Sequence, residues 1–243
     1  MQKIFLINII FFGVILQFLS CTSDIDNFTP PNGTIHGALL DKITKDTVYT
    51  TNNTQGYSFP DGVLNVFQQN YSASAAGPQG TSFTQNGTFK NNSIFEGQYK
   101  AIPIGAFYAD TALINVSGDT KVDFHVTPFL KVNINVDTKT ANSIKVNFSA
   151  NTNTDKHTVN EMAVWLGTTE GVNRFSWRGS SFNPVDYDSY RQNHWDLSAN
   201  SSFTKTFQNL SPNTTYYIRA GAKASGDNPQ GYWNYSKILK IKL

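Results

Sequence analysis

Aromatic and charged side chains are interleaved between residues 167 and 202, and this interval carries the strongest chemical signal in the sequence. Its rings and its charged groups are Trp177, Tyr187, Tyr190 and Trp195, and Arg178, Asp188, Arg191 and Asp196. No apolar periodicity would bury the rings, and leaving a large apolar side chain in water forgoes about 1.5–3 kcal/mol. Sugar rings stack on Trp and Tyr through flat C–H faces, and charged groups form strong hydrogen bonds with hydroxyls. The eight residues are therefore candidate glycan ligands.

The same rings also have a structural interpretation. They could fold back as a satellite cluster that closes one end of a β-sandwich, or they could pack against a preceding domain. Trp165 lies on a predicted strand and is assigned to strand packing. Tyr232 and Trp233 lie near the C-terminus on a predicted turn, where they fit either the aromatic platform or the core.

The only cysteine of the chain, Cys21, follows a segment typical of export signals. Lys3 precedes an apolar run from Ile4 to Leu19, and the small residue Ser20 stands before the cysteine. This is the order of charge, apolar region and small cleavage residue in a signal peptide. A cysteine directly after the cleavage position is typical of a bacterial lipoprotein, in which the thiol is diacylated, and two acyl chains suffice for stable anchoring.

We therefore expect a lipoprotein signal peptide over residues 1–20 and a linker over residues 21–32. Phe18 and Leu19 depart from the usual leucine and small residue at these positions, so a plain signal peptide or a membrane anchor stays open. The apolar run is short for a membrane span. Asp24 and Asp26 follow the cysteine closely, which resembles the export signal of Bacteroidetes surface lipoproteins. The resemblance implies display on the cell surface, although an ordinary linker would look the same.

Composition argues against several classes of chemistry. With Cys21 as the only thiol, no disulfide, cysteine–zinc site or cysteine nucleophile is expected in the body of the chain. A net charge of +2 gives no basic field for nucleic acid. The histidines are scattered without metal-ligand spacing, and solvated or structural roles are expected for His36, His125, His157 and His194. No nucleophile motif or spaced carboxylate pair is apparent. The sequence predicts no enzyme, no metal and no cofactor.

Apolar residues alternate with polar ones wherever the pattern is clear. The alternation runs through residues 121–127, 131–136 and 144–149, and polar turn residues separate such segments. A period of two with one apolar face is typical of strands in a sandwich. We therefore predict an all-β chain of two tandem antiparallel β-sandwiches, over residues 33–127 and 128–243, with a long insertion near 167–202 in the second.

The first predicted domain contains three short motifs, which are the Gly33–Gly37 opening, the Asn86–Phe89 turn and the Gly97–Tyr99 strand start. In this order they resemble the carboxypeptidase-regulatory-like, transthyretin-type sandwich. In the second domain, Leu210 to Ala220 resembles the E–F corner of a fibronectin type III module. That resemblance implies that the Tyr216 hydroxyl bonds to upstream backbone and that Ile218 and Ala220 point into the core.

The two modules behind a lipidation site resemble a Bacteroidetes family of outer-membrane lipoproteins of unassigned biochemistry. Its members accompany starch-utilisation-type glycan-uptake systems. The resemblance implies a non-catalytic accessory protein, lipid-anchored through Cys21 at the outer membrane, whose partners are polysaccharide or oligosaccharide and outer-membrane uptake proteins. A structural stalk or protein-docking subunit without glycan binding is the alternative. Exposure of the Trp177 and Trp195 rings in one groove would favour the first.

Overall fold

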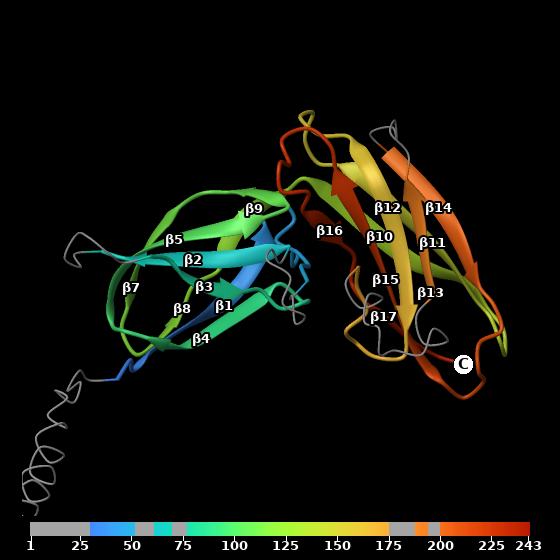
Figure 1. Cartoon of the computed structure of the whole chain (residues 1–243), viewed down its shortest axis with the longest axis horizontal. Helices are drawn as coiled ribbons and strands as arrows, with labels where there is room; N and C mark the ends of the chain where they lie inside the picture. The colour runs from blue at the N-terminus through green and yellow to red at the C-terminus, as the bar shows by residue number, and fades with distance from the viewer. Residues whose placement is uncertain (1–29, 52–60, 70–76, 175–187, 194–199) are drawn as a thin grey trace, which may run out of the picture. The chain divides into compact units, whose positions relative to one another are not determined.

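The computed structural model describes residues 30–51, 61–69, 77–174 and 200–243, and the backbone alone for residues 188–193. Asn32–Leu243 forms one compact unit. The described residues contain strands and turns without helix, so the all-β prediction is confirmed. Among these residues no helix is long and apolar enough to cross a membrane. Figure 1 traces the strands in chain order.

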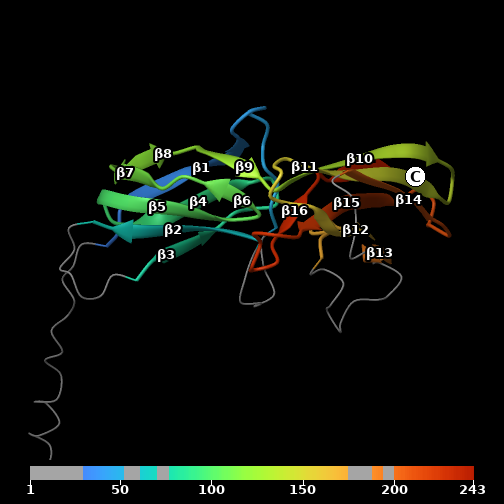
Figure 2. The same ribbon diagram turned by 90° about the horizontal axis from the view of Figure 1, so that it is seen from above.

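Two sheets enclose the first core. The first sheet has the order β4-β1-β9-β6, with β8 also paired to β1, and its strands are β1 (Gly33–Asp41), β4 (Thr88–Ile94), β6 (Phe107–Ala109), β8 (Asp119–Lys121) and β9 (Phe124–Pro128). The second has the order β3-β2-β5-β7, with strands β2 (Gly62–Gln68), β3 (Gln79–Ser82), β5 (Gly97–Gly105) and β7 (Ala112–Val116). Seen from above, β1 and β8 lie over β2 and β3 (Figure 2), with the side chains of Ile35, Leu64 and Tyr99 buried.

The predicted strand over residues 121–127 is divided in two. Between β8 and β9, the Val122 N–H donates to the His36 carbonyl (2.8 Å) and Asp123 Oδ1 accepts from the Ala38 N–H (3.0 Å). Gly37 permits this approach, because a Cβ there would lie 1.8 Å from the Val122 carbonyl oxygen. Both β8 and β9 pair with β1 in parallel, a local exception within the antiparallel sandwiches that the sequence predicts. Alternation reveals which face is buried, not the direction of the neighbouring strand.

Two further sheets enclose the second core. One has the order β10-β11-β14, with strands β10 (Leu130–Lys139), β11 (Ile144–Thr152) and β14 (Asn200–Phe207). The other has the order β13-β12-β15-β16, with β17 also on β15, and its strands are β12 (Val159–Gly167), β13 (Asp188–Asn193), β15 (Thr215–Ala224), β16 (Trp233–Tyr235) and β17 (Leu239–Lys242). Figure 2 shows β10 and β11 over β12 and β13. The interval predicted as an insertion thus contributes a strand, β13.

The second core contains the side chains that the alternation predicted. Ile144, Val146 and Phe148 are buried, as are Ile218 and Ala220 from β15. The predicted corner contact is also present, because the Tyr216 hydroxyl accepts a hydrogen bond from the Ser211 N–H at 2.8 Å. This bond fixes the turn that leads into β15, the central strand of its sheet.

Candidate functional site

Most of the predicted glycan ligands lie outside the described residues. These are Trp177, Arg178, Tyr187, Trp195 and Asp196. The other three, Asp188, Tyr190 and Arg191, belong to β13, where their backbones pair with Leu166, Val164 and Ala163 of β12. The backbone therefore brings three of the eight candidates onto one strand at the edge of a sheet.

Two tryptophans outside that interval form a buried cluster on the outer face of the β12–β15–β16 sheet. Trp165 and Trp233 are 2% and 3% exposed, and their ring centroids are 5.6 Å apart. Tyr235 packs beside Trp165 at 6.0 Å. The packing role predicted for Trp165 is confirmed, and Trp233 takes its packing alternative. Tyr232 is half-buried against the second core.

Gly221 of β15 lies beneath both indoles. A Cβ at this position would stand 2.9 Å from two ring atoms of Trp165 and 3.2 Å from the Trp233 ring. The missing side chain therefore lets the two rings lie against the backbone of the central strand, which explains how so large a pair is buried on the outer face of a sheet.

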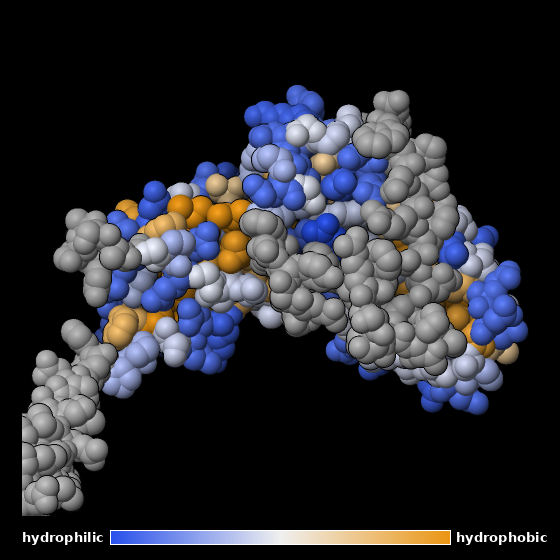
Figure 3. Space-filling model, viewed as in Figure 1, coloured by the Kyte–Doolittle hydropathy of each residue, from blue (hydrophilic) through white to orange (hydrophobic). Residues whose placement is uncertain are grey.

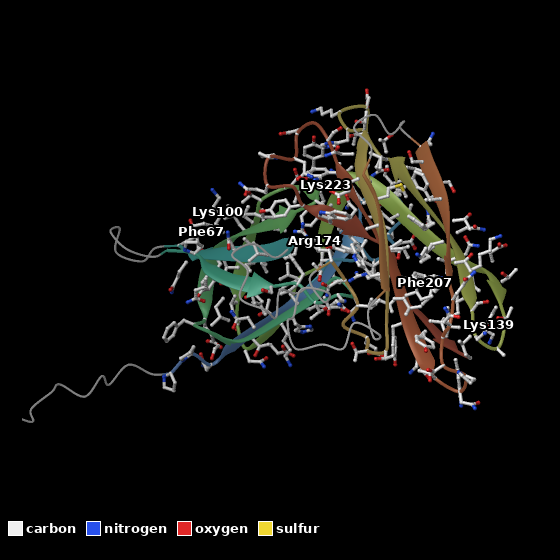
Figure 4. All side chains as sticks on the ribbon, turned by 45° about the vertical axis from the view of Figure 1, so that its right-hand side comes forward. Phe67, Lys100, Lys139, Arg174, Phe207 and Lys223 are labelled. Carbon is white, nitrogen blue, oxygen red and sulfur yellow. The ribbon has the colours of Figure 1, made fainter. Side chains whose placement is uncertain are left out.

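Beside this cluster, Asp61 receives a full set of hydrogen bonds. Its carboxylate accepts from Arg174 Nη2 (2.7 Å) and Nε (2.9 Å), from the Trp233 N–H (3.1 Å) and from the Tyr235 hydroxyl. Figure 4 labels Arg174, which lies within the interval 167–202 and precedes the predicted glycan ligands. Burial raises the pKa of Asp61, and the Arg174 guanidinium and the hydrogen bonds only partly oppose this effect. The same burial, followed by the nearby Asp61 charge, raises the pKa of Tyr235.

Arg219 of β15 is fully buried next to Tyr235. Its Nη2 donates to the carbonyls of Thr50 (2.7 Å) and Gln85 (3.1 Å), and its Nε donates to that of Ser236 (3.1 Å). The guanidinium carbon lies 4.5 Å from the centre of the Tyr235 ring. Burial lowers the pKa of Arg219 to about 10, so the side chain remains a cation at neutral pH. We call Asp61, Arg174, Arg219 and Tyr235 the joint, because they link residues of β1–β9 to those of β10–β17.

A groove of about 710 Å³ opens next to the joint. Its walls are the turn after β1 (residues 41–49), the start of β10 (residues 128–134) and the segment 234–237. Tyr235 borders both the groove and the joint. The volume falls within the roughly 300–1,000 Å³ of small-molecule sites.

The groove combines one partly exposed ring with charged and amide groups. Tyr49 is half-buried against the Trp165–Trp233 cluster and also lines the groove. The charged lining residues are Lys45, Lys131, Lys237, Asp41 and Asp46, and Asn133 adds an exposed amide. A ring beside donors and acceptors of both charges can hold a polyhydroxylated ligand through stacking and hydrogen bonds.

The walls of the groove are held by internal hydrogen bonds. Asp41 Oδ1 accepts from the N–H groups of Ile43 (2.8 Å) and Thr44 (3.2 Å), which closes the turn. On the opposite wall, the Asn234 side chain accepts from the Leu130 N–H (3.0 Å) and donates to the Ala106 carbonyl (2.9 Å). Because these groups are already bonded within the protein, a ligand would meet a groove that is formed in advance.

The histidines have different surroundings. His157 is buried; its Nδ1 donates to the Ser225 carbonyl (2.8 Å), so its Nε2 is available to accept from the Tyr108 hydroxyl (3.0 Å). This is a structural role. His36 lies 3.4 Å from Asp119 and is half-buried, His125 is exposed, and His194 lies outside the described residues. The described part of the chain contains no group of His, Cys, Asp and Glu suited to hold a metal ion.

A second surface feature is an apolar strip on the outer face of β2, β5 and β7. It consists of Val63, Phe67, Ile102, Ile104 and Leu113, of which Leu113 is 80% exposed and the others are partly exposed. Figure 3 shows hydrophobic residues gathered on this side of the molecule, and Figure 4 labels Phe67 beside Lys100. We call these five residues the apolar strip.

Sequence reasoning did not find the joint or the groove. Arg219 carried a usable signal, since it interrupts the apolar run from Ile218 to Ala222 and a charge within such a run is commonly paired when buried. Asp61 and Lys237 stand in ordinary turn and loop sequence, and no pattern marks them. Only the fold brings residues 41–49 next to residues 234–237.

Comparison with known proteins gives a family match for part of the chain. Residues 41–127 match the model of the N-terminal domain of a protein of unknown function, DUF3823. No curated protein matches the sequence.

Solved structures resemble the chain over most of its length. A "putative carbohydrate binding protein" from Bacteroides uniformis is 23% identical, with a TM-score of 0.68 over 88% of this chain and 100% of that one. DUF3823 family proteins from Bacteroides uniformis and Parabacteroides merdae are each 18% identical, with TM-scores of 0.67 and 0.66 and the same coverage. At these identities the likeness is one of fold, and it extends over both pairs of sheets.

Proposed function

We propose that this protein is a non-catalytic accessory protein that captures polysaccharide or oligosaccharide at the cell surface. It is anchored in the outer membrane through a lipid on Cys21 and works beside outer-membrane glycan-uptake proteins. The single observation that carries the proposal is the groove of about 710 Å³, with Tyr49 beside exposed lysine, aspartate and asparagine side chains. The fold shared with the "putative carbohydrate binding protein" from Bacteroides uniformis supports the same conclusion.

The groove suits capture better than chemistry. Its carboxylates, Asp41 and Asp46, lie on one turn, and Asp41 is occupied by the backbone of that turn and by Lys131. Glycoside hydrolysis needs two carboxyl groups on opposite sides of the bond, one protonated and one ionised. Stacking and hydrogen bonding need only the ring and polar groups that the groove offers, and several weak contacts add up when the ligand is a repeating polymer.

The predicted ligands of the interval 167–202 form the second part of the proposal. Trp177, Tyr187, Tyr190 and Trp195 would supply further stacking surfaces, and Arg178, Asp188, Arg191 and Asp196 would supply hydrogen bonds. Arg174, which precedes them, is fixed to Asp61. The groove and this interval make separate predictions, because different substitutions test them.

A polysaccharide binding screen tests the proposal. The chain with Cys21→Ser, and variants of it with Tyr49→Ala or with Trp177→Ala and Trp195→Ala together, would be titrated with soluble polysaccharides. We expect the wild-type surface to bind at least one glycan and Tyr49→Ala to weaken binding about fivefold, since one stacking contact contributes about 1 kcal/mol. The exposed Leu113→Ala is the matched control, because it lies on the apolar strip. A folded wild type that binds no glycan would overturn the proposal.

The alternative, a protein-docking subunit, is favoured by the apolar strip. Side chains such as Leu113 and Phe67 on an open sheet face are the kind of surface that a protein partner covers. The substitution Leu113→Asp distinguishes the two functions. If this variant no longer assembles with uptake proteins but still binds glycan, docking and capture use different faces of the protein.

A further inference from the structure

We propose that the groove selects oligosaccharides that carry carboxylates, that is, chains of uronic acids. The inference rests on the proposed function, since it names the class of sugar that the same groove takes. It is carried by the charges that line the groove and by how many of them are already neutralised within the protein.

The two aspartates of the groove are not equivalent. Asp41 is buried, and its Oδ1 accepts from the backbone N–H groups of Ile43 and Thr44. Its Oδ2 lies 3.6 Å from Lys131 Nζ. Asp41 therefore belongs to the frame of the turn and offsets the charge of Lys131. Asp46 is exposed and is the other carboxylate of the lining.

Two further lysines, Lys45 and Lys237, line the groove together with that one exposed carboxylate. Lys45 Nζ donates to a neutral partner, the Lys42 carbonyl, at 2.8 Å. Lys237 is exposed, and it has no carboxylate within salt-bridge distance among the residues that the structure describes. The groove lining thus carries an excess of positive charge, with three lysines against two aspartates, although the chain as a whole carries only +2.

The backbone around Lys45 gives a second reason. Its φ of 64° lies in the left-handed region, where glycine and asparagine are the usual residues and a long side chain costs on the order of 1 kcal/mol. The position therefore holds an ammonium at the groove where a residue without charge would fit the turn better. Such local strain is commonly found at binding sites.

Lysine also suits a uronate better than a neutral sugar. An ammonium on a flexible stem is a point charge that can follow a carboxylate in more than one orientation. The sugar ring would stack on Tyr49, and its carboxylate would form an ion pair with the ammonium group of Lys237 or Lys45. A neutral sugar would use the same ring and gain nothing from the excess charge.

Paired ligands that differ only in charge test this inference. The full chain in detergent would be titrated with oligomers of galacturonate, glucuronate and mannuronate, with their methyl esters, and with neutral cello-oligosaccharides. We expect at least one free acid to bind about tenfold more tightly than its ester, since hydrogen bonds to charged groups contribute about 1.5–3 kcal/mol. We also expect the preference to shrink as salt is raised.

Groove variants locate the effect. Lys237→Gln and Lys45→Gln should each lower affinity for the acid about three- to tenfold and leave affinity for the ester unchanged, whereas Tyr49→Ala should lower both. Lys100→Gln, on the outer face of β5, is the matched control. Equal binding of acid and ester, binding of neutral glycans alone, or acid binding unaffected by both lysine variants would overturn the inference and leave the proposed function standing. No binding of any glycan by the folded chain would overturn both.

Discussion

The joint and the groove share Tyr235 and a similar set of residue types, but they differ in how their charges are satisfied. In the joint, the Asp61 carboxylate accepts four hydrogen bonds and the buried Arg219 donates to three carbonyls. In the groove, Lys45, Asp46 and Lys237 are exposed. Aromatic and charged residues side by side therefore do not by themselves indicate a ligand site. The same residue types hold a structure together when they are buried and paired, and remain available for a ligand when they are not.

The difference has an energetic basis. Removing charges from water costs several kcal/mol per ion, and a buried charge is tolerated only when its partners offset most of that cost. Such an arrangement penalises any other placement of the groups that contribute to it. Residues 50, 61 and 85 contribute from the first pair of sheets, so the joint fixes the wall that the groove shares through Tyr235.

The largest expected effect is at Arg219. Arg219→Met removes the donor for the carbonyls of Thr50, Gln85 and Ser236 and leaves them buried without it, so we expect a loss of about 3–5 kcal/mol in the free energy of unfolding. Chemical denaturation measures it. Lys223→Met is the comparison variant, because Lys223 lies four residues further along β15 and pairs with Glu161 at 3.1 Å, while its own side chain is 27% exposed (Figure 4). Water can reach this ammonium group, so the substitution should cost less than Arg219→Met. Equal losses in the two variants would contradict a special role for the joint.

The next largest effect is at Asp61. Asp61→Asn keeps an acceptor for Trp233 or Tyr235 but loses the ion pair with Arg174, whose side chain is 25% exposed. Because Arg174 is partly exposed, water can solvate its guanidinium when the carboxylate is lost. We therefore expect the free energy of unfolding to fall by about 2–3 kcal/mol, less than for Arg219→Met. A double-mutant cycle with Arg174→Gln would separate the pair from the remaining bonds. An interaction energy near zero would show that Arg174 contributes little.

The joint also predicts a dependence on pH. Burial raises the pKa of Asp61 in the folded protein above its ordinary value of 3.8. The folded state therefore binds the Asp61 proton more tightly than the unfolded state does. The resulting gain in the free energy of unfolding is fully present below pH 3.8 and is lost as the pH rises through the raised pKa. The unfolding free energy of wild type minus that of Asp61→Asn should accordingly be larger at pH 4 than at pH 7. A difference that grows with pH would mean that Arg174 outweighs burial.

A smaller effect is expected beneath the tryptophan pair. Gly221→Ala places a Cβ 2.9 Å from Trp165 ring atoms, so the two indoles must shift, at a cost of about 1–2 kcal/mol. Near-ultraviolet circular dichroism and denaturation would report the shift and the loss. Gly171→Ala is the control, because a Cβ there would meet its nearest heavy atom at 3.9 Å. Unchanged stability in Gly221→Ala would show that the cluster has room to adjust.

The sequence predicted the strands better than the contacts between them. Alternation correctly predicted the burial of Ile144, Val146 and Phe148, and the corner motif correctly predicted the backbone hydrogen bond of Tyr216, which Ser211 donates. Both features are local properties of a strand or a turn. Alternation did not give the parallel pairing of β8 and β9 with β1, since one buried face looks the same in either direction.

The joint and the groove could not be predicted for a different reason. Each is assembled from segments more than a hundred residues apart, as the Asp61–Arg174 and Arg219–Thr50 contacts show. Trp233 fitted platform and core equally well in the sequence, because residue type does not reveal whether a ring is covered. Exposure is a property of the assembled sheets, so it is the quantity that sequence patterns report least well.

The smallest expected effect is the one that defines the groove. Lys237→Gln should change the free energy of unfolding by less than about 0.5 kcal/mol, as is usual for an exposed side chain without a structural partner. Compared with the loss for Arg219→Met, this value contrasts an exposed cation of the groove with a buried cation of the joint. A loss above about 1 kcal/mol would mean that the Lys237 ammonium is already committed to holding the fold. It would then belong with the joint, because a charge that the protein itself uses for stability is not available to a ligand without loss.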